Sequence, residues 1–93
     1  MLTLDKLSRC RRGIDETSLA LYDLIKELKA DIATIEKDIS WNEKMHFAVI
    51  AQEMTKKHDQ MKAKLADYEH LQECCEKTIE HIKDSEKWAV AMK

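Results

Sequence analysis

The segment Ser40-Trp41-Asn42-Glu43 lies between two long stretches that carry the same helical pattern in different phases. Ser40 followed three residues later by Glu43 is a capping box, in which two side chains satisfy free backbone N–H groups at a helix start. A new helix that begins where the first pattern ends requires a reversal of the chain. The segment therefore predicts a turn over residues 40–43. One uninterrupted helix is the alternative, because no glycine or proline enforces a stop.

Apolar residues recur at alternating steps of three and four on both sides of this segment. The steps before it fall on Leu4, Leu7, Arg11, Ile14, Ser18, Leu21, Ile25, Leu28, Ile32, Ile35 and Ile39. The steps after it fall on Phe47, Ala51, Met54, His58, Met61, Leu65, Tyr68, Gln72, Cys75, Ile79, Ile82, Glu86 and Ala89. Apolar residues at this spacing form one helical face and are typical of a coiled-coil seam. The two stripes predict one helix over residues 3–39 and another over residues 43–91.

A turn centred near Trp41 would determine which seam residues face each other in an antiparallel hairpin. Arg11 then falls opposite Gln72, so that one polar residue meets another, and His58 falls opposite Ile25. A buried polar group without a partner costs about 1–3 kcal/mol. The match at Arg11 therefore favours this register, and with it a second helix longer than the first.

The composition agrees with an all-α protein that forms a single helical domain over residues 1–93. Proline is absent, Gly13 is the one glycine, and charged residues make up 37% of the chain. β-rich domains need turns, and turns depend on glycine and proline. Gly13 leaves an alternative open, in which a break near it gives three helices. We expect the first helix to continue, because one glycine in a helix costs only about 1 kcal/mol.

Charge and cysteine content limit the classes of partner. The net charge is −2, which gives no general electrostatic reason to bind nucleic acid or an anionic membrane. The chain has no run of 18 or more apolar residues, so the sequence predicts no membrane span. Three cysteines, two of them adjacent, do not resemble a disulfide framework. Reduced thiols and a cytoplasmic location are the simpler interpretation.

Apolar residues outside the seam predict association with other protein. The predicted interaction residues are Trp41, Met45, Phe47 and Ile50 near the turn, and Trp88, Val90 and Met92 beyond the end of the first helix. Exposed apolar patches of this kind mark association surfaces. A lone hairpin buries one narrow seam, whereas two hairpins that form a helical bundle bury the wider stripes. The sequence thus predicts an adaptor, assembly factor or secretion-type chaperone; a self-assembling structural homo-oligomer is the alternative.

Catalysis and metal binding receive little support from the residue pattern. His70, Cys74 and His81 share one helical face, and imidazole and thiolate groups bind zinc or copper. That face is offset from the seam and no fourth ligand is apparent, so a solvated polar face is the favoured interpretation. Cysteine–histidine catalysis needs a concave pocket that excludes water, which a hairpin does not offer. We therefore expect a protein that is not an enzyme and needs no cofactor.

The layout resembles that of the small secreted WXG100 proteins, which form a hairpin with a tryptophan in the central turn. The corresponding residues here are Trp41-Asn42-Glu43, so the glycine of that family is missing. Tyr68 is followed four residues later by Gln72 and not by the acid of the family's C-terminal signal. The resemblance concerns topology alone. It implies a secreted helical-hairpin protein as a further alternative function.

Overall fold

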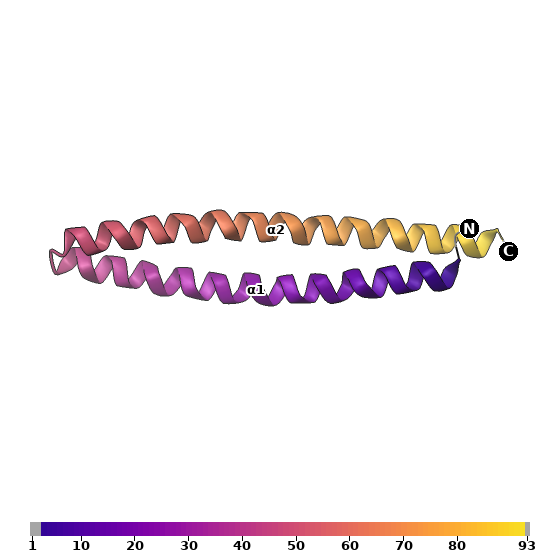
Figure 1. Ribbon diagram of the computed structural model, residues 1–93, viewed down its shortest axis with the longest axis horizontal. Coiled ribbons are helices and arrows are strands. Elements are labelled where there is room, and N and C mark those ends of the chain that lie inside the picture. Colours follow the sequence, from indigo (N-terminus) through magenta and orange to yellow (C-terminus); the bar gives the residue numbers. More distant parts are fainter. Residues whose placement is uncertain (1–2, 93) are drawn as a thin grey trace. The chain divides into compact units, whose positions relative to one another are not determined.

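Two long helices account for nearly all of the chain in the computed structural model, which describes residues 3–92. Helix α1 spans Leu4–Lys44 and helix α2 spans Ala48–Ala91 (Figure 1). Within residues 3–92 there is no strand, which confirms the prediction of an all-α helical hairpin. None of the helices in this range is long and apolar enough to cross a membrane.

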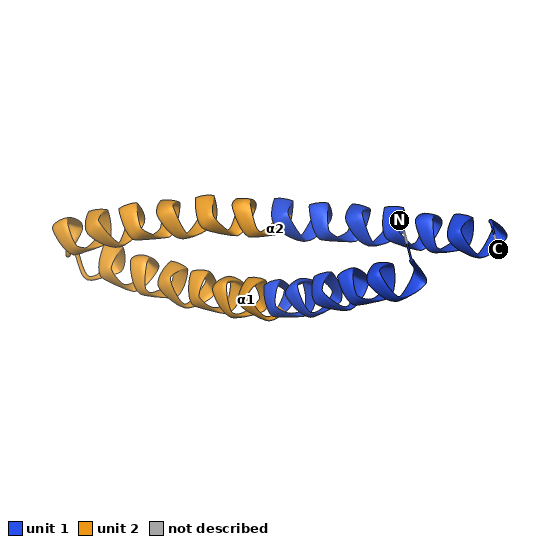
Figure 2. Cartoon of the chain, turned by 45° about the vertical axis from the view of Figure 1, so that its right-hand side comes forward, with its two compact units in different colours: residues 1–22, 70–93 blue, residues 23–69 orange. Residues whose placement is uncertain are grey.

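The chain divides into two compact units, each of which contains part of both helices (Figure 2). Residues 23–69 form the unit that includes the turn, called here the turn unit. The residues up to Tyr22 and those from His70 onward form the other, called here the terminal unit. In each unit a segment of α1 packs antiparallel to a segment of α2.

The predicted seam is confirmed in both helices. Every stripe residue from Leu4 to Ile39 and from Ala51 to Ala89 is buried or half-buried. The exception is Phe47, which is exposed. The buried apolar residues are Leu7, Leu21, Ile25, Ile32 and Ala51. No large side chain among residues 3–92 is fully buried, so the seam is a narrow core that stays open along its edges.

Helix α1 passes through Gly13 without interruption, so the alternative of a break into three helices is wrong. A Cβ built on Gly13 would meet no atom within 4 Å, which shows that no close packing requires a glycine there. The local cost of one glycine is small beside the packing of the residues that flank it on the seam, Arg11 and Ile14.

The turn lies later in the chain than predicted. Helix α1 continues through Ser40 and Glu43, because Asn42 extends the seam: it is 6% exposed, and its side-chain amide donates to the carbonyl of Asp38 at 2.8 Å. The helix ends where His46 adopts a positive φ of 62°. The N–H of His46 donates to the Glu43 carbonyl and the N–H of Phe47 to the Asn42 carbonyl, at 3.1 and 2.8 Å. These two bonds form a Schellman motif, with histidine at the left-handed position that glycine usually takes.

The later turn changes the register. Arg11 pairs with Glu86 and not with the predicted Gln72, and His58 pairs with Glu36 and not with Ile25. Each partner is displaced by about three to four helical turns. The helices have 41 and 44 residues, so the second helix is longer than the first by much less than predicted. In the terminal unit Val90 lies beside Leu4 in a shallow hollow, although the prediction left it unopposed.

Candidate interaction surfaces

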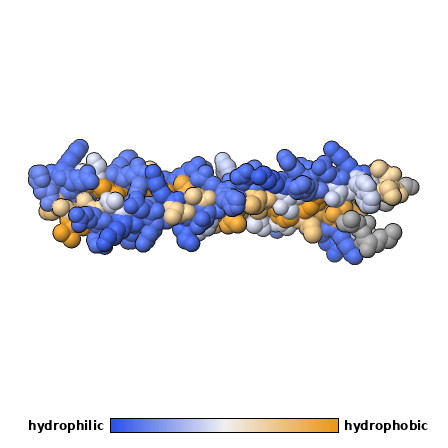
Figure 3. Space-filling view, turned by 90° about the horizontal axis from the view of Figure 1, so that it is seen from above, coloured by the Kyte–Doolittle hydropathy of each residue, from blue (hydrophilic) through white to orange (hydrophobic). Residues whose placement is uncertain are grey.

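Five apolar side chains around the turn are exposed and form what we call the turn patch. They are Trp41, Met45, Phe47, Val49 and Ile50, with exposed fractions between 44% and 74%. Apolar atoms reach the surface at this end of the molecule in the space-filling view (Figure 3). The four residues that the sequence predicts near the turn are all exposed, and Trp41, which belongs to α1 and not to the turn itself, contacts Phe47.

Two members of the turn patch also hold the turn in place. The ring centroids of Trp41 and Phe47 are 6.1 Å apart at an interplanar angle of 50°. A hydrophobic contact between these two positions commonly accompanies a Schellman motif. Trp41 and Phe47 therefore have a structural role in addition to any role in binding, whereas Val49, at 74% exposed, makes the least contact with its own chain.

A second group of exposed apolar residues, called here the terminal patch, lies near the end of α2. Its members Trp88, Val90 and Met92 are 56%, 58% and 68% exposed. Trp88 and Met92 lie one turn apart on the same face of α2, whereas Val90 lies on a different face, in the hollow that it shares with Leu4 and Arg11 of α1. These are the three C-terminal interaction residues that the sequence predicts.

An apolar groove runs between the helices of the turn unit, and sequence reasoning missed it. Its floor is formed by Leu28, Ile35, Met54, Met61 and Tyr68. On the α1 side it is bordered by Asp31, Thr34 and Asp38, and on the α2 side by Lys57, Gln60, Ala63, Lys64 and Asp67. We call this the turn-unit groove. A signal was present, because Asp31/Asp38 and Lys57/Lys64 each repeat at the heptad spacing beside the seam, but the register was needed to place them on one groove.

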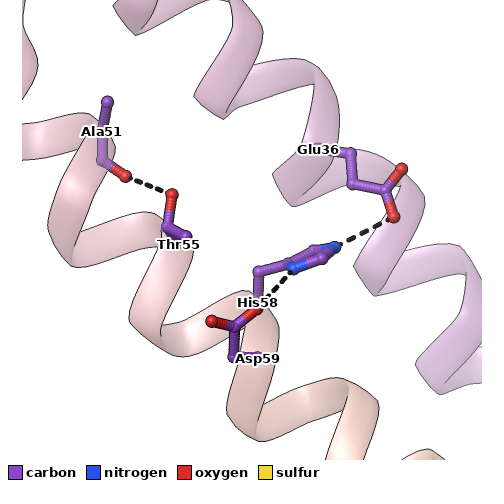
Figure 4. Close-up of polar contacts among 5 residues, drawn as sticks. All are labelled: Glu36, Ala51, Thr55, His58 and Asp59. Carbon is purple, nitrogen blue, oxygen red and sulfur yellow. Dashed lines mark hydrogen bonds and ion pairs between the residues drawn. The ribbon is translucent and has the colours of Figure 1, made fainter.

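On another edge of the seam in the turn unit, His58 links the two helices (Figure 4). Its Nε2 lies 3.0 Å from Oε1 of Glu36 on α1, and its Nδ1 lies 3.3 Å from Oδ1 of Asp59. Hydrogen bonding to Glu36, and then to Asp59, raises the pKa of His58 above its ordinary value of 6.5. Desolvation and the charge of Lys62 act in the opposite direction and are smaller.

The terminal unit contains a corresponding polar contact between the helices. Arg11 donates from Nε to Oε1 of Glu86 at 2.8 Å, and the two side chains are 34% and 21% exposed. Both residues are polar positions of the predicted seam. One pair of polar seam residues therefore meets across the helices, although the partner of Arg11 differs from the one expected.

The candidate metal ligands are only partly brought together. Nε2 of His70 lies 3.8 Å from Sγ of Cys74, one turn away on α2. In the range 3–92 no group of three or more His, Cys, Asp or Glu side chains is placed to hold a metal ion, so His81 does not complete a site. Cys10 and Cys74 are exposed, Cys75 is half-buried on the seam, and all three are free thiols.

Comparison with known proteins adds no assignment. No protein family, curated protein or solved structure matches this chain.

Proposed function

We propose that this protein is a small non-enzymatic interaction module, an adaptor, assembly factor or secretion-type chaperone, that binds other protein through exposed apolar helix faces. The observation that carries the proposal is the turn patch, in which five large apolar side chains around the turn are exposed, whereas residues 3–92 contribute only five buried apolar residues to the core. Apolar surface of this extent is costly to leave in water and is typical of association sites.

The form of the surface indicates an elongated apolar partner segment. An amphipathic helix that lies in a groove or across a helical face is recognised through apolar residues at three- and four-residue spacing. The turn patch presents such residues on both sides of the turn, from Trp41 in α1 to Ile50 in α2. The three free thiols support a cytoplasmic location.

Two variants test the proposal without disturbing the contacts of the turn. Val49→Ser changes the turn patch and Trp88→Ser changes the terminal patch, and neither residue belongs to the Trp41–Phe47 contact. Ala33→Ser, at an exposed position of α1 outside both patches, is the matched control. Each chain is used as bait in affinity capture, and circular dichroism verifies equal helicity.

The expected result is a set of proteins captured by the wild type and by Ala33→Ser, and lost with at least one of the two patch variants. The proposal is wrong if the patch variants capture the same proteins as the wild type. It is also wrong if the wild type captures nothing except further copies of itself.

A second candidate function is self-assembly, in which the oligomer is the functional form. The turn-unit groove favours it, because the groove exposes an apolar floor between charged borders, as do the faces by which hairpins associate into helical bundles. The two candidates use different surfaces and are compatible with each other.

A further inference from the structure

The floor of the turn-unit groove has the repeat that a pair of helices recognises. Leu28 and Ile35 are one heptad apart on α1, and Met54, Met61 and Tyr68 follow at heptad steps on α2. All five are half-buried, so the seam covers part of each side chain and leaves the rest open. Side chains with this spacing interdigitate with those of other helices in coiled-coil bundles. The occupant that fits is therefore helical.

The borders of the groove carry opposite charges. Asp31 and Asp38 stand on the α1 border, and Lys57 and Lys64 stand on the α2 border. No ion pair joins the two borders anywhere in residues 3–92. An occupant must present lysines to α1 and acids to α2. A second copy of this groove has that arrangement, because it carries both borders itself.

The charges also determine how the second copy must lie. If the two-fold axis is parallel to the helices, α1 of one copy packs beside α2 of the other, and each acidic border meets a basic one. If the axis is perpendicular to the helices and lies in the interface, α1 packs on α1 and acid meets acid. Like charges placed together across an interface cost several kcal/mol. The first arrangement is therefore favoured.

The charged residues of the two borders lie at matching positions along the helix axis, which we call their heights. The contact between Glu36 and His58 places these two residues at the same height, and so fixes how α1 and α2 are aligned along their length in the turn unit. Asp31 lies about one and a half turns before Glu36, and Lys64 lies about the same distance along the antiparallel α2 from His58.

The second pair of oppositely charged residues, Asp38 and Lys57, also lies at one height. Asp38 is two positions after Glu36, and Lys57 is one position before His58. The members of both pairs thus lie within about 1.5 Å of the same height. Rotation about an axis parallel to the helices preserves height, so Asp31 of one copy reaches Lys64 of the other and Asp38 reaches Lys57.

We propose that the turn-unit groove is the interface of a homodimer, in which two copies pack face to face about a two-fold axis parallel to the helices. Asp31 and Asp38 of each copy then pair with Lys64 and Lys57 of the other around a shared apolar floor. The inference rests on the proposed role of exposed apolar helix faces in association, and it names a second copy of the chain as the occupant of the turn-unit groove.

The dimer places both turns at the same end. Met45 is one heptad after Asp38 and Ile50 is one heptad before Lys57, so these exposed apolar residues continue the two borders towards the turn. Asp67 adds an acid at the end of the groove farthest from the turn. Two turn patches at one end would bind a partner with two sites more tightly than one patch, without any new contact.

Charge reversal tests the pairing. The wild type is expected to sediment as a dimer. The D31K/D38K and K57E/K64E variants each place like charges together, which should raise the dissociation constant of the dimer more than about tenfold. A mixture of the two variants restores a dimer with one copy of each, because one variant then carries two basic borders and the other two acidic ones. The fourfold variant D31K/D38K/K57E/K64E restores the homodimer.

The control is K26E/K37E, which reverses two exposed charges of α1 that do not line the groove and should leave the dimer intact. Restoration by mixing excludes misfolding as the cause of dissociation. A wild type that is monomeric or larger than a dimer overturns the proposal, as does a D31K/D38K variant that dimerises like the wild type. Because these measurements use the purified chain alone, their failure leaves the capture of other proteins at the turn patch to its own test.

Disulfide crosslinking tests the direction of the axis. In a background without native cysteines (C10S/C74S/C75A), D38C chains mixed with K57C chains should form a crosslinked heterodimer on mild oxidation. D38C chains alone should crosslink far less, because Asp38 does not face its own copy when the axis is parallel to the helices. Efficient crosslinking of D38C chains to each other, with no D38C–K57C heterodimer in the mixture, would show the other arrangement.

Discussion

His58 of α2 is joined to Glu36 of α1 by a 3.0 Å contact between Nε2 and Oε1. The contact couples the pairing of the helices to the protonation of one imidazole. Protonated histidine donates from both nitrogens, so Glu36 and Asp59 each stabilise the charged form and raise its pKa.

Because the pKa of His58 is raised in the folded state, its contribution to stability is fully present below the unfolded pKa of about 6.5 and is lost as the pH rises through the folded value. We expect the melting temperature of the wild type to fall as the pH rises from about 6.5 through the higher folded pKa of His58. The His58→Gln variant should lose part of this dependence, and Glu36→Gln should do the same. Differential scanning calorimetry at fixed protein concentration measures it.

The chain contains three further histidines, so the comparison needs a matched variant. His46→Gln removes a histidine that makes no side-chain ion pair among the described residues. The difference between wild type and variant should depend on pH for His58→Gln more strongly than for His46→Gln. Equal slopes for the two variants would contradict the role assigned to the Glu36 contact.

The contact between Arg11 and Glu86 should contribute more than an ordinary surface ion pair. It joins two helices and the two side chains are only 34% and 21% exposed, whereas Arg9 and Asp5 are exposed and lie one turn apart on α1. A double-mutant cycle with Arg11→Gln and Glu86→Gln should give a coupling of about 1–2 kcal/mol. The cycle with Arg9→Gln and Asp5→Asn should give less than about 0.5 kcal/mol. Equal couplings would show that Arg11 and Glu86 do not pair in solution.

Much of the pairing face was predictable, since it depends on spacing alone. A side chain three or four residues from the last one on a helix returns to the same face, so counting placed Leu7, Ile25 and Ile32 in the core. The same count includes Phe47, which is exposed because the chain has left the helix there.

The position of the turn was not predictable from the same signals. Ser40 and Glu43 are the residue types of a capping box, but both residue types are also compatible with the interior of a helix. The helix ends through the backbone of His46, for which the sequence offers no glycine as a marker. A displaced turn changes every contact between the helices, and the turn-unit groove was missed for that reason, although each of its residues is at a regular spacing.

Gly13→Ala should stabilise the protein by about 0.5–1 kcal/mol, because alanine restricts the unfolded chain and is the better helix former. The substitution meets no atom within 4 Å, and the bond from Thr17 Oγ1 to the carbonyl of residue 13 uses the backbone alone. Ala33→Gly, at an exposed position of the same helix, should shift the free energy of unfolding by a similar amount in the opposite direction. A destabilising Gly13→Ala would indicate that α1 bends at this residue in solution.

His46→Gly should also stabilise the protein, for a reason confined to the turn. His46 holds a φ of 62°, which costs a residue with a side chain about 1 kcal/mol and costs glycine almost nothing. The loss of entropy that glycine brings to the unfolded chain offsets part of this, so a gain of about 0.5 kcal/mol is expected. Lys44→Gly, at the last residue of α1, is the control, since helical backbone there should make glycine destabilising by up to about 1 kcal/mol. Chemical denaturation of both variants measures the difference, and a His46→Gly variant that loses as much stability as Lys44→Gly would mean that α1 does not end in a left-handed residue at position 46.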